Sequence, residues 1–215
     1  MHYQTSEFVI ESELAAKPVS QTNKYVIEYI ANLPRNLYVL DYGCGKLRYS
    51  IPLAMQVKQV IGIDSTYQVD SSKKIGECIC SPRDYKMNNL AVMSIDDHDW
   101  RENVYDVVFC TNVLSAVPVE SARLEIIENA KKVLKRDGYL FISVQYRNSY
   151  FSQYKTREDV VPYNDGWFIR RGRTNKGSFY AMLDAEYIIS LCQRAGFDQF
   201  TVNKRDGSCF IEARN

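Results

Sequence analysis

The stretch LYVLDYGCGKLR, residues 37–48, decides how the chain is organised. An apolar run at 37–40 ends in the carboxylate of Asp41 and then in Gly43 and Gly45, so a buried strand stops abruptly in a loop. Glycines permit positive φ and remove the side chains that would block a ligand. A helix over 47–55 would point its N-terminus at the same spot. The pattern predicts a site for a nucleoside-bearing cofactor.

A second apolar run, residues 60–63, also ends in a carboxylate, Asp64. An acidic residue at the end of the second strand is the type that binds a ribose diol in doubly wound nucleotide sites. Strand, helix and strand then form one βαβ unit with parallel strands and a right-handed crossover. The alternative is a purely structural role, in which Asp41 and Asp64 only cap the helices that follow them.

Length and composition bound the fold class. A chain of 215 residues is long enough for one sizeable α/β domain over 1–215, for which we expect an N-terminal arm at 1–19 and an insert at 145–179. With 27 basic and 26 acidic residues, overall charge indicates neither a nucleic-acid nor a membrane partner. Lacking a leader-like start and an apolar run of about twenty residues, the chain is expected to be cytoplasmic.

The six cysteines lack C-x-x-C spacing. We therefore expect small core residues in a reducing compartment, with no metal site and no disulfide framework.

The remaining helices and strands are predicted from the hydrophobic period and from residues that cap or end such elements. Ser20 is expected to cap a helix that ends before Pro34, and Gly138 to cap the C-terminus of a helix over 119–134. Residues 69–80 fit a further helix. Residues 145–179 do not keep the hydrophobic period of a helix or of a strand for long, which is typical of a functional loop or lid. Strands are expected at 90–94, 105–110, 139–144, 199–203 and 208–213. Asp206-Gly207 is a hairpin signal between the last two.

From residue 26 to its end, the chain resembles the class I S-adenosylmethionine-dependent methyltransferases. The matching pieces, in order, are LDYGCGK at 40–46, VIGID at 60–64, the acidic pair Asp96-Asp97, YDVVFCTNVLSAVP at 105–118 and KKVLKRDGYLFISV at 131–144. The resemblance implies a seven-stranded, mostly parallel sheet with a C-terminal antiparallel hairpin and helices on both faces. It also implies an enzyme that uses S-adenosyl-L-methionine. Leu47 stands where the family usually has a third glycine, and Arg48 stands where a dinucleotide fingerprint would need one.

The same resemblance implies a set of cofactor-binding residues. The backbone of the glycine loop would lie against the methionine and ribose, Asp41 would hold the loop and the ammonium, and Asp64 would accept both ribose hydroxyls. Asp96 or Asp97 would accept from the adenine amino group. The full set is Asp41, Gly43, Cys44, Gly45, Asp64, Ser65, Asp96, Asp97, Asn112 and Val113.

The insert gives the only indication of the methyl acceptor. Its basic residues alternate with aromatic ones, and Tyr146, Arg147, Arg170, Arg171 and Arg173 are the candidate acceptor-binding residues. Basic side chains neutralise phosphates and aromatic faces stack on bases, which fits a nucleic acid. The same composition fits a lid over a small polar molecule or a protein interface.

A methyltransferase needs no protein nucleophile, because the sulfonium methyl is already activated. No catalytic residue is assigned, and His98 in its polar loop fits a solvated turn. Two classes of function stay open: an active methyltransferase, or a cofactor-binding subunit of a complex without turnover.

Overall fold

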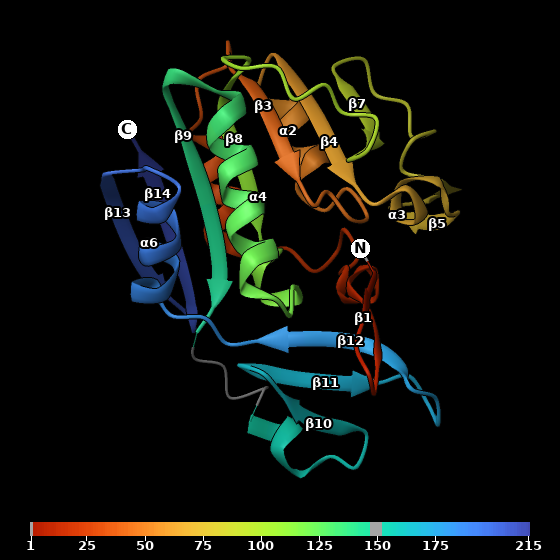
Figure 1. The fold of residues 1–215 in the computed structure, drawn as a ribbon. Coiled ribbons are helices and arrows are strands. Elements are labelled where there is room, and N and C mark those ends of the chain that lie inside the picture. Colours follow the sequence, from red (N-terminus) through yellow and green to blue (C-terminus); the bar gives the residue numbers. More distant parts are fainter. Residues whose placement is uncertain (1, 147–151) are drawn as a thin grey trace. The chain divides into compact units, whose positions relative to one another are not determined.

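A computed structural model describes residues 2–146 and 152–215 (Figure 1). The chain divides into two compact units, which are described separately. The first comprises Met1–Ala15, Thr111–Glu128 and Phe141–Arg214, and the second comprises Ala16–Cys110, Asn129–Leu140 and Asn215.

The central sheet has seven strands in the order β13-β14-β9-β8-β3-β4-β7. Its strands are β3 (Tyr38–Tyr42), β4 (Gln59–Asp64), β7 (Leu90–Ser94), β8 (Tyr105–Thr111), β9 (Leu134–Gln145), β13 (Gln199–Arg205) and β14 (Ser208–Arg214). β3 pairs in parallel with β4 and β8, and β4 with β7, whereas β13 and β14 are antiparallel. Most residues of β3 and β8 are buried, as expected for strands covered on both faces. The predicted fold class is confirmed.

The C-terminal hairpin has the expected turn. Asp206 and Gly207 both have positive φ, 49° and 73°, which is the geometry of a two-residue type I′ turn. Arg205 pairs with Ser208 directly across it, so the turn fixes the register of the whole hairpin. The helix before it, α6 (Ala185–Arg194), is capped by Asp184 and packs on β14.

Helices of the second unit differ from prediction at their ends. α1 (Lys24–Ala31) is capped by Asn23, whose Oδ1 accepts from the Tyr25 amide at 2.9 Å, so the assignment of Ser20 as the cap is wrong. α2 (Ser50–Gln56) begins three residues after Leu47. α3 (Thr66–Asp70) is a single short turn capped by Ser65.

The predicted helix over 69–80 is also wrong, because most of that stretch forms a small hairpin. Its strands are β5 (Lys73–Ile75) and β6 (Cys78–Cys80). Gly76 in the turn has a φ of 59°, which a glycine adopts without strain.

α4 (Glu120–Val133) passes directly into β9 at Leu134. Gly138 therefore lies inside the strand and is not a helix cap. A Cβ on Gly138 would lie 3.0 Å from the carbonyl oxygens of Asp106 and Lys135, so close backbone packing explains the glycine. Lys135 Nζ bonds Asp106 Oδ1 at 2.8 Å, while Asp106 Oδ2 accepts from the Tyr38 amide at 2.7 Å.

The expected arm and insert form a second sheet in the first unit. Its order is β1-β2-β12-β11-β10, in which β1 (His2–Gln4) and β2 (Val9–Glu11) come from the arm. β10 (Val160–Tyr163), β11 (Gly166–Arg170) and β12 (Lys176–Ala181) come from the insert. β2 pairs in parallel with β12. The expectation of a structureless loop over 145–179 is therefore wrong.

Three short helical turns complete the described elements: η1 (Ser12–Ala15), η2 (Leu114–Ala116) and η3 (Gln153–Thr156). No helix in 2–146 or 152–215 is both long and apolar enough to cross a bilayer.

Candidate cofactor site

The glycine loop follows β3 and is tied to the end of β4. The amides of Gly43 and Cys44 both donate to the Ile63 carbonyl, at 2.8 and 3.0 Å. Gly43 and Gly45 have φ values of 78° and 56°, in the region that favours glycine. Leu47 has a φ of 61° and is fully buried. The backbone at this third position therefore keeps a glycine-like conformation although the residue is leucine.

Asp64 lies against this loop at the end of β4. Its Oδ2 accepts from the Gly45 amide at 2.9 Å, and its Oδ1 accepts from the Ser65 amide at 2.7 Å. Two oxygens offer about four lone-pair positions. The carboxylate can therefore hold the loop and still accept from a ligand hydroxyl.

Asp41 is buried and lies two residues before Gly43. The Ser50 hydroxyl donates to its Oδ2 at 2.5 Å, which fastens the end of β3 to the start of α2. Burial raises the pKa of Asp41 to about 6, the Ser50 hydrogen bond opposes that rise, and the negative charge of Asp64 adds to it. Asp41 is thus bonded to Ser50, a serine that the sequence analysis did not identify.

The surroundings of Gly45 fit a ligand that bonds to the loop. A Cβ on Gly45 would lie 3.3 Å from the Ala16 Cβ and 3.8 Å from Gln68 Nε2. That Gln68 nitrogen is buried and has no hydrogen-bond partner, which is a costly state for an amide. A glycine backbone, a carboxylate and an unpaired donor therefore meet here, which suits the polar edge of a nucleoside.

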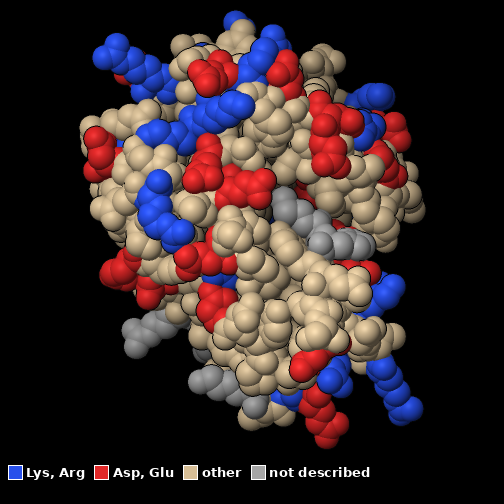
Figure 2. All heavy atoms as spheres, in the orientation of Figure 1, with Lys and Arg blue, Asp and Glu red and all other residues tan. Residues whose placement is uncertain are grey.

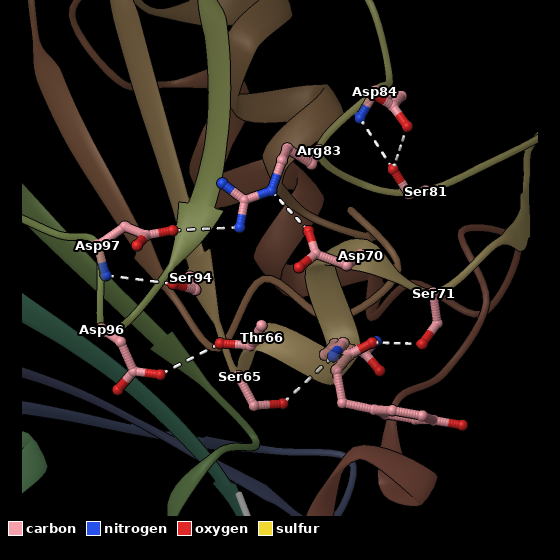
Figure 3. Close-up of polar contacts among 12 residues, drawn as sticks. Ser65, Thr66, Asp70, Ser71, Ser81, Arg83, Asp84, Ser94, Asp96 and Asp97 are labelled. Atoms are coloured by element: carbon pink, nitrogen blue, oxygen red, sulfur yellow. Dashed lines mark hydrogen bonds and ion pairs between the residues drawn. The ribbon is translucent and has the colours of Figure 1, made fainter.

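The acidic pair after β7 is held by two different groups, drawn in Figure 3. Thr66 Oγ1 donates to Asp96 Oδ2 at 3.1 Å. Arg83 donates through Nε to Asp70 at 2.6 Å and through Nη2 to Asp97 at 3.2 Å. The Ser94 hydrogen bond, and then Arg83, lower the pKa of Asp97. Asp97 is thus engaged by a cation, which leaves Asp96 as the better placed of the two for an adenine amino group.

Asn112 and Val113 follow β8 in the first unit. Asn112 has a φ of 59°, and its amide donates to the Ser143 carbonyl at 2.8 Å, so the chain turns sharply beside β9. An asparagine tolerates this left-handed conformation better than most residues.

The candidate acceptor residues are not gathered in one place. Tyr146 follows β9, where its amide donates to Gly207 and its ring lies 5.3 Å from Lys204 Nζ. Arg170, Arg171 and Arg173 lie at the end of β11 and in the turn before β12, and all three are exposed. Arg147 lies outside the described residues.

Sequence reasoning missed Ser50, Thr66, Gln68 and Arg83. Ser50 begins the helix after the first acidic strand end, and Gln68 follows the second, Asp64, by four residues, which is a weak signal that could have indicated them. Arg83 lies in a polar stretch without periodicity, and only the fold brings it to Asp97. No group of three or more His, Cys, Asp or Glu side chains in the described part of the chain is arranged to hold a metal ion.

Comparison with known proteins identifies the family. A model described as "Methyltransferase domain" matches residues 16–202. The uncharacterized protein YmfD of Escherichia coli K12 is 32% identical over 218 residues, which cover 98% of this chain and 95% of that protein. A ubiquinone biosynthesis O-methyltransferase of Actinobacillus pleuropneumoniae serotype 7 is 31% identical over 131 residues, 59% of this chain and 55% of that enzyme. The chain thus matches about half the length of this second relative.

Solved structures agree on the fold. A SAM-dependent methyltransferase of Methanosarcina mazei has a TM-score of 0.63 at 18% identity, covering 90% of this chain and 98% of its own. A Burkholderia thailandensis 1,6-didemethyltoxoflavin-N1-methyltransferase, solved with 1,6-didemethyltoxoflavin and S-adenosylhomocysteine, has a TM-score of 0.61 at 16% identity, covering 89% and 77%. The chain belongs to the class I S-adenosylmethionine-dependent methyltransferases and is an enzyme whose methyl donor is S-adenosyl-L-methionine.

Proposed function

We propose that the enzyme methylates a small molecule. The observation that carries this proposal is the position of the insert's aromatic side chains. Phe168 and Phe179 are fully buried, Phe168 stacks on Phe8 at 4.2 Å between ring centroids, and Tyr163 meets Phe8 edge to face at 5.8 Å. Phe8, Phe168 and Phe179 are buried in the second sheet and Tyr163 packs against Phe8, so these rings are not a platform on which bases could stack.

The charges of the insert support the same conclusion. Arg157 pairs with Asp159, and Arg123 of α4 engages Asp165. On the face shown in Figure 2, basic and acidic side chains are interspersed, without a continuous basic area. A nucleic-acid acceptor would call for such an area along its backbone path. The named activities of the ubiquinone O-methyltransferase and the toxoflavin N-methyltransferase also concern small molecules.

Roles for the cofactor-side residues follow from the same proposal. We propose that Asp64 and the Gly43–Gly45 backbone hold the ribose and methionine, with Ser65 beside them, and that Asp96 accepts from adenine. Asn112 and Val113 are proposed for the methionine side, as the family pattern implies. When bound, the cofactor supplies a methyl group on a sulfonium. The protein then has to orient the acceptor lone pair in line with that methyl and keep water out.

A nucleic-acid acceptor is the second candidate, and the exposed turn between β11 and β12 favours it. Arg170, Arg171, Arg173 and Lys176 lie in or beside this turn, and the segment 166–181 contains no acidic residue.

Labelled cofactor separates the two candidates. The protein is incubated with S-adenosylmethionine carrying a labelled methyl group and with separate RNA, DNA, protein and metabolite fractions. Label is expected in the metabolite fraction, and the variant in which Arg170, Arg171 and Arg173 are all alanine should transfer at the wild-type rate. Label in RNA or DNA that this variant abolishes would establish the second candidate. No transfer to any fraction, with S-adenosylhomocysteine still bound, would instead indicate a subunit without turnover.

A further inference from the structure

Two buried hydroxyl groups in the first unit have no hydrogen-bond partner. Ser115 lies in η2 and Ser143 in β9, and the Oγ atoms of both are shielded from solvent and unpaired. A serine hydroxyl can donate one hydrogen bond and accept two. Leaving both unpaired costs free energy, so such groups in a native protein call for an explanation.

The hydroxyl of Ser115 acts on Tyr180, and Ser143 lies on the same strand as Gln145, the hydrogen-bond partner of Tyr180. Gln145 lies two residues after Ser143 and therefore on the same face of β9. The Tyr180 hydroxyl donates to Gln145 Oε1 at 2.8 Å, which joins β12 to the end of β9. β12 also packs against η2, the turn that carries Ser115.

Tyr180 is a neutral phenol in this setting. Burial raises its pKa, and the Ser115 hydroxyl opposes that rise, although the two groups do not adopt the geometry of a hydrogen bond. Its cross-strand neighbour is Trp167, which is half-buried. An indole and a phenol thus stand side by side on one face of the second sheet.

We infer that Ser115 and Ser143, flanked by Tyr180 and Trp167, bind the methyl acceptor, and that this acceptor is planar and uncharged. The inference rests on the proposed function. Flat aromatic side chains pack favourably on a planar ring. The four polar side chains, Ser115, Ser143, Gln145 and Tyr180, are all uncharged, so they suit carbonyl, hydroxyl or ring-nitrogen groups better than a carboxylate or phosphate, which would need a cation. None of these four side chains is a carboxylate or an imidazole that would act as a general base at neutral pH.

Serine-to-alanine variants test the inference because the two possible roles of the serines predict opposite changes in stability. If the hydroxyls bind a ligand, removing one should not destabilise the free enzyme, whereas removing a structural hydroxyl should. Ser143→Ala and Ser115→Ala each remove a buried unpaired polar group, so the free enzyme should be as stable as wild type or more so in thermal unfolding. Ser190→Ala, which removes a paired, exposed hydroxyl on α6, is the matched control.

Acceptor binding is measured by calorimetry on protein saturated with S-adenosylhomocysteine. The probes are 4-methylcatechol and 2-hydroxyquinoline, both planar and neutral, with phenyl phosphate as the charged comparison. Each serine variant should bind the neutral probes about 3- to 10-fold more weakly, the cost of one lost hydrogen bond. Phenyl phosphate should bind more weakly than either to wild type.

Three results would overturn the inference: neither neutral probe binds, the serine variants bind them as wild type does, or Ser143→Ala lowers the melting temperature more than Ser190→Ala. Binding of S-adenosylhomocysteine by the same protein distinguishes a failure of the proposed acceptor site from a failure of the proposed function. If it persists while the probes fail, the acceptor site is wrong; if label also reaches only nucleic acid, the proposed function is wrong.

Discussion

Asp41 shows how one buried carboxyl makes stability depend on pH. Its pKa in the folded protein is about 6, above its ordinary value of 3.8. As pH rises from about 4 to 6, the unfolded chain releases this proton and the folded chain retains it, so the free energy of unfolding falls. Above pH 6 the full loss remains, and a shift of this size corresponds to about 3 kcal/mol.

Asp41→Asn removes that titration. Relative to wild type, the variant should gain about 2 kcal/mol between pH 4 and pH 7, slightly less than the full shift because relaxation softens burial effects. Urea unfolding at a series of pH values measures it. The exposed Asp137→Asn should follow the wild-type curve, and parallel curves for Asp41→Asn would contradict the assignment.

Asp64 supports both the loop and the proposed ribose contact. In Asp64→Asn an amide replaces one of the two oxygens that accept from Gly45 and Ser65. Losing charge-assisted hydrogen bonds of about 1.5–3 kcal/mol should weaken S-adenosylhomocysteine binding by about 10- to 100-fold. Calorimetry measures the affinity, with Asp84→Asn as a control outside the loop. An unchanged affinity would place the ribose elsewhere.

At the scale of elements, Arg123 of α4 joins three parts of the first unit. Its side chain is 1% exposed, and it donates to the Val117 carbonyl at 2.8 Å, to Asp165 Oδ1 at 2.9 Å and to the Tyr187 hydroxyl at 3.0 Å. Asp165 lies in the turn between β10 and β11, and Tyr187 lies on α6. One guanidinium therefore fixes the insert and α6 to α4.

Arg123→Met should lower the free energy of unfolding by about 3 kcal/mol, because it leaves buried carbonyls and a carboxylate unpaired. Arg194→Met is the matched control, since Arg194 pairs with Glu120 at the surface, with side chains 50% and 52% exposed. That exposed pair is worth less than about 1 kcal/mol. Equal losses in denaturant unfolding would show that burial of Arg123 is not what matters.

At the scale of the molecule, the first unit depends on its N-terminal strands. Phe8 stacks on Phe168, and Ile10 of β2 is fully buried beside β12. Phe8→Ala should cost about 3 kcal/mol in that sheet by opening a cavity. Hydrogen exchange should then accelerate in β11 and β12 while β3 and β4 keep their protection. Uniform acceleration would mean that the two units unfold together.

The sequence was sufficient for β3 and β4 of the central sheet because each is an apolar run that reaches a carboxylate, Asp41 or Asp64. The second sheet was missed since β2 and β12 pair across more than 160 residues, and the three residues of β2 are too few to show a period. The glycine loop and its carboxylates were identified locally. Arg83 was missed because only the fold brings it to Asp97, and the spacing of Gln68 from Asp64 was too weak a signal to place its side chain at the loop.

Leu47 has a consequence for the entropy of cofactor binding. A leucine held at a φ of 61° carries strain of about 1–2 kcal/mol. This strain lowers the stability of the folded protein and does not add to the cost of binding the cofactor. A glycine there would be freer before binding and would lose that freedom when the ligand arrives. Leu47→Gly should therefore bind S-adenosylhomocysteine with a less favourable entropy than wild type, and Leu47→Met should not. Calorimetry at one temperature compares them, and identical entropies would show that this residue does not preorganise the loop.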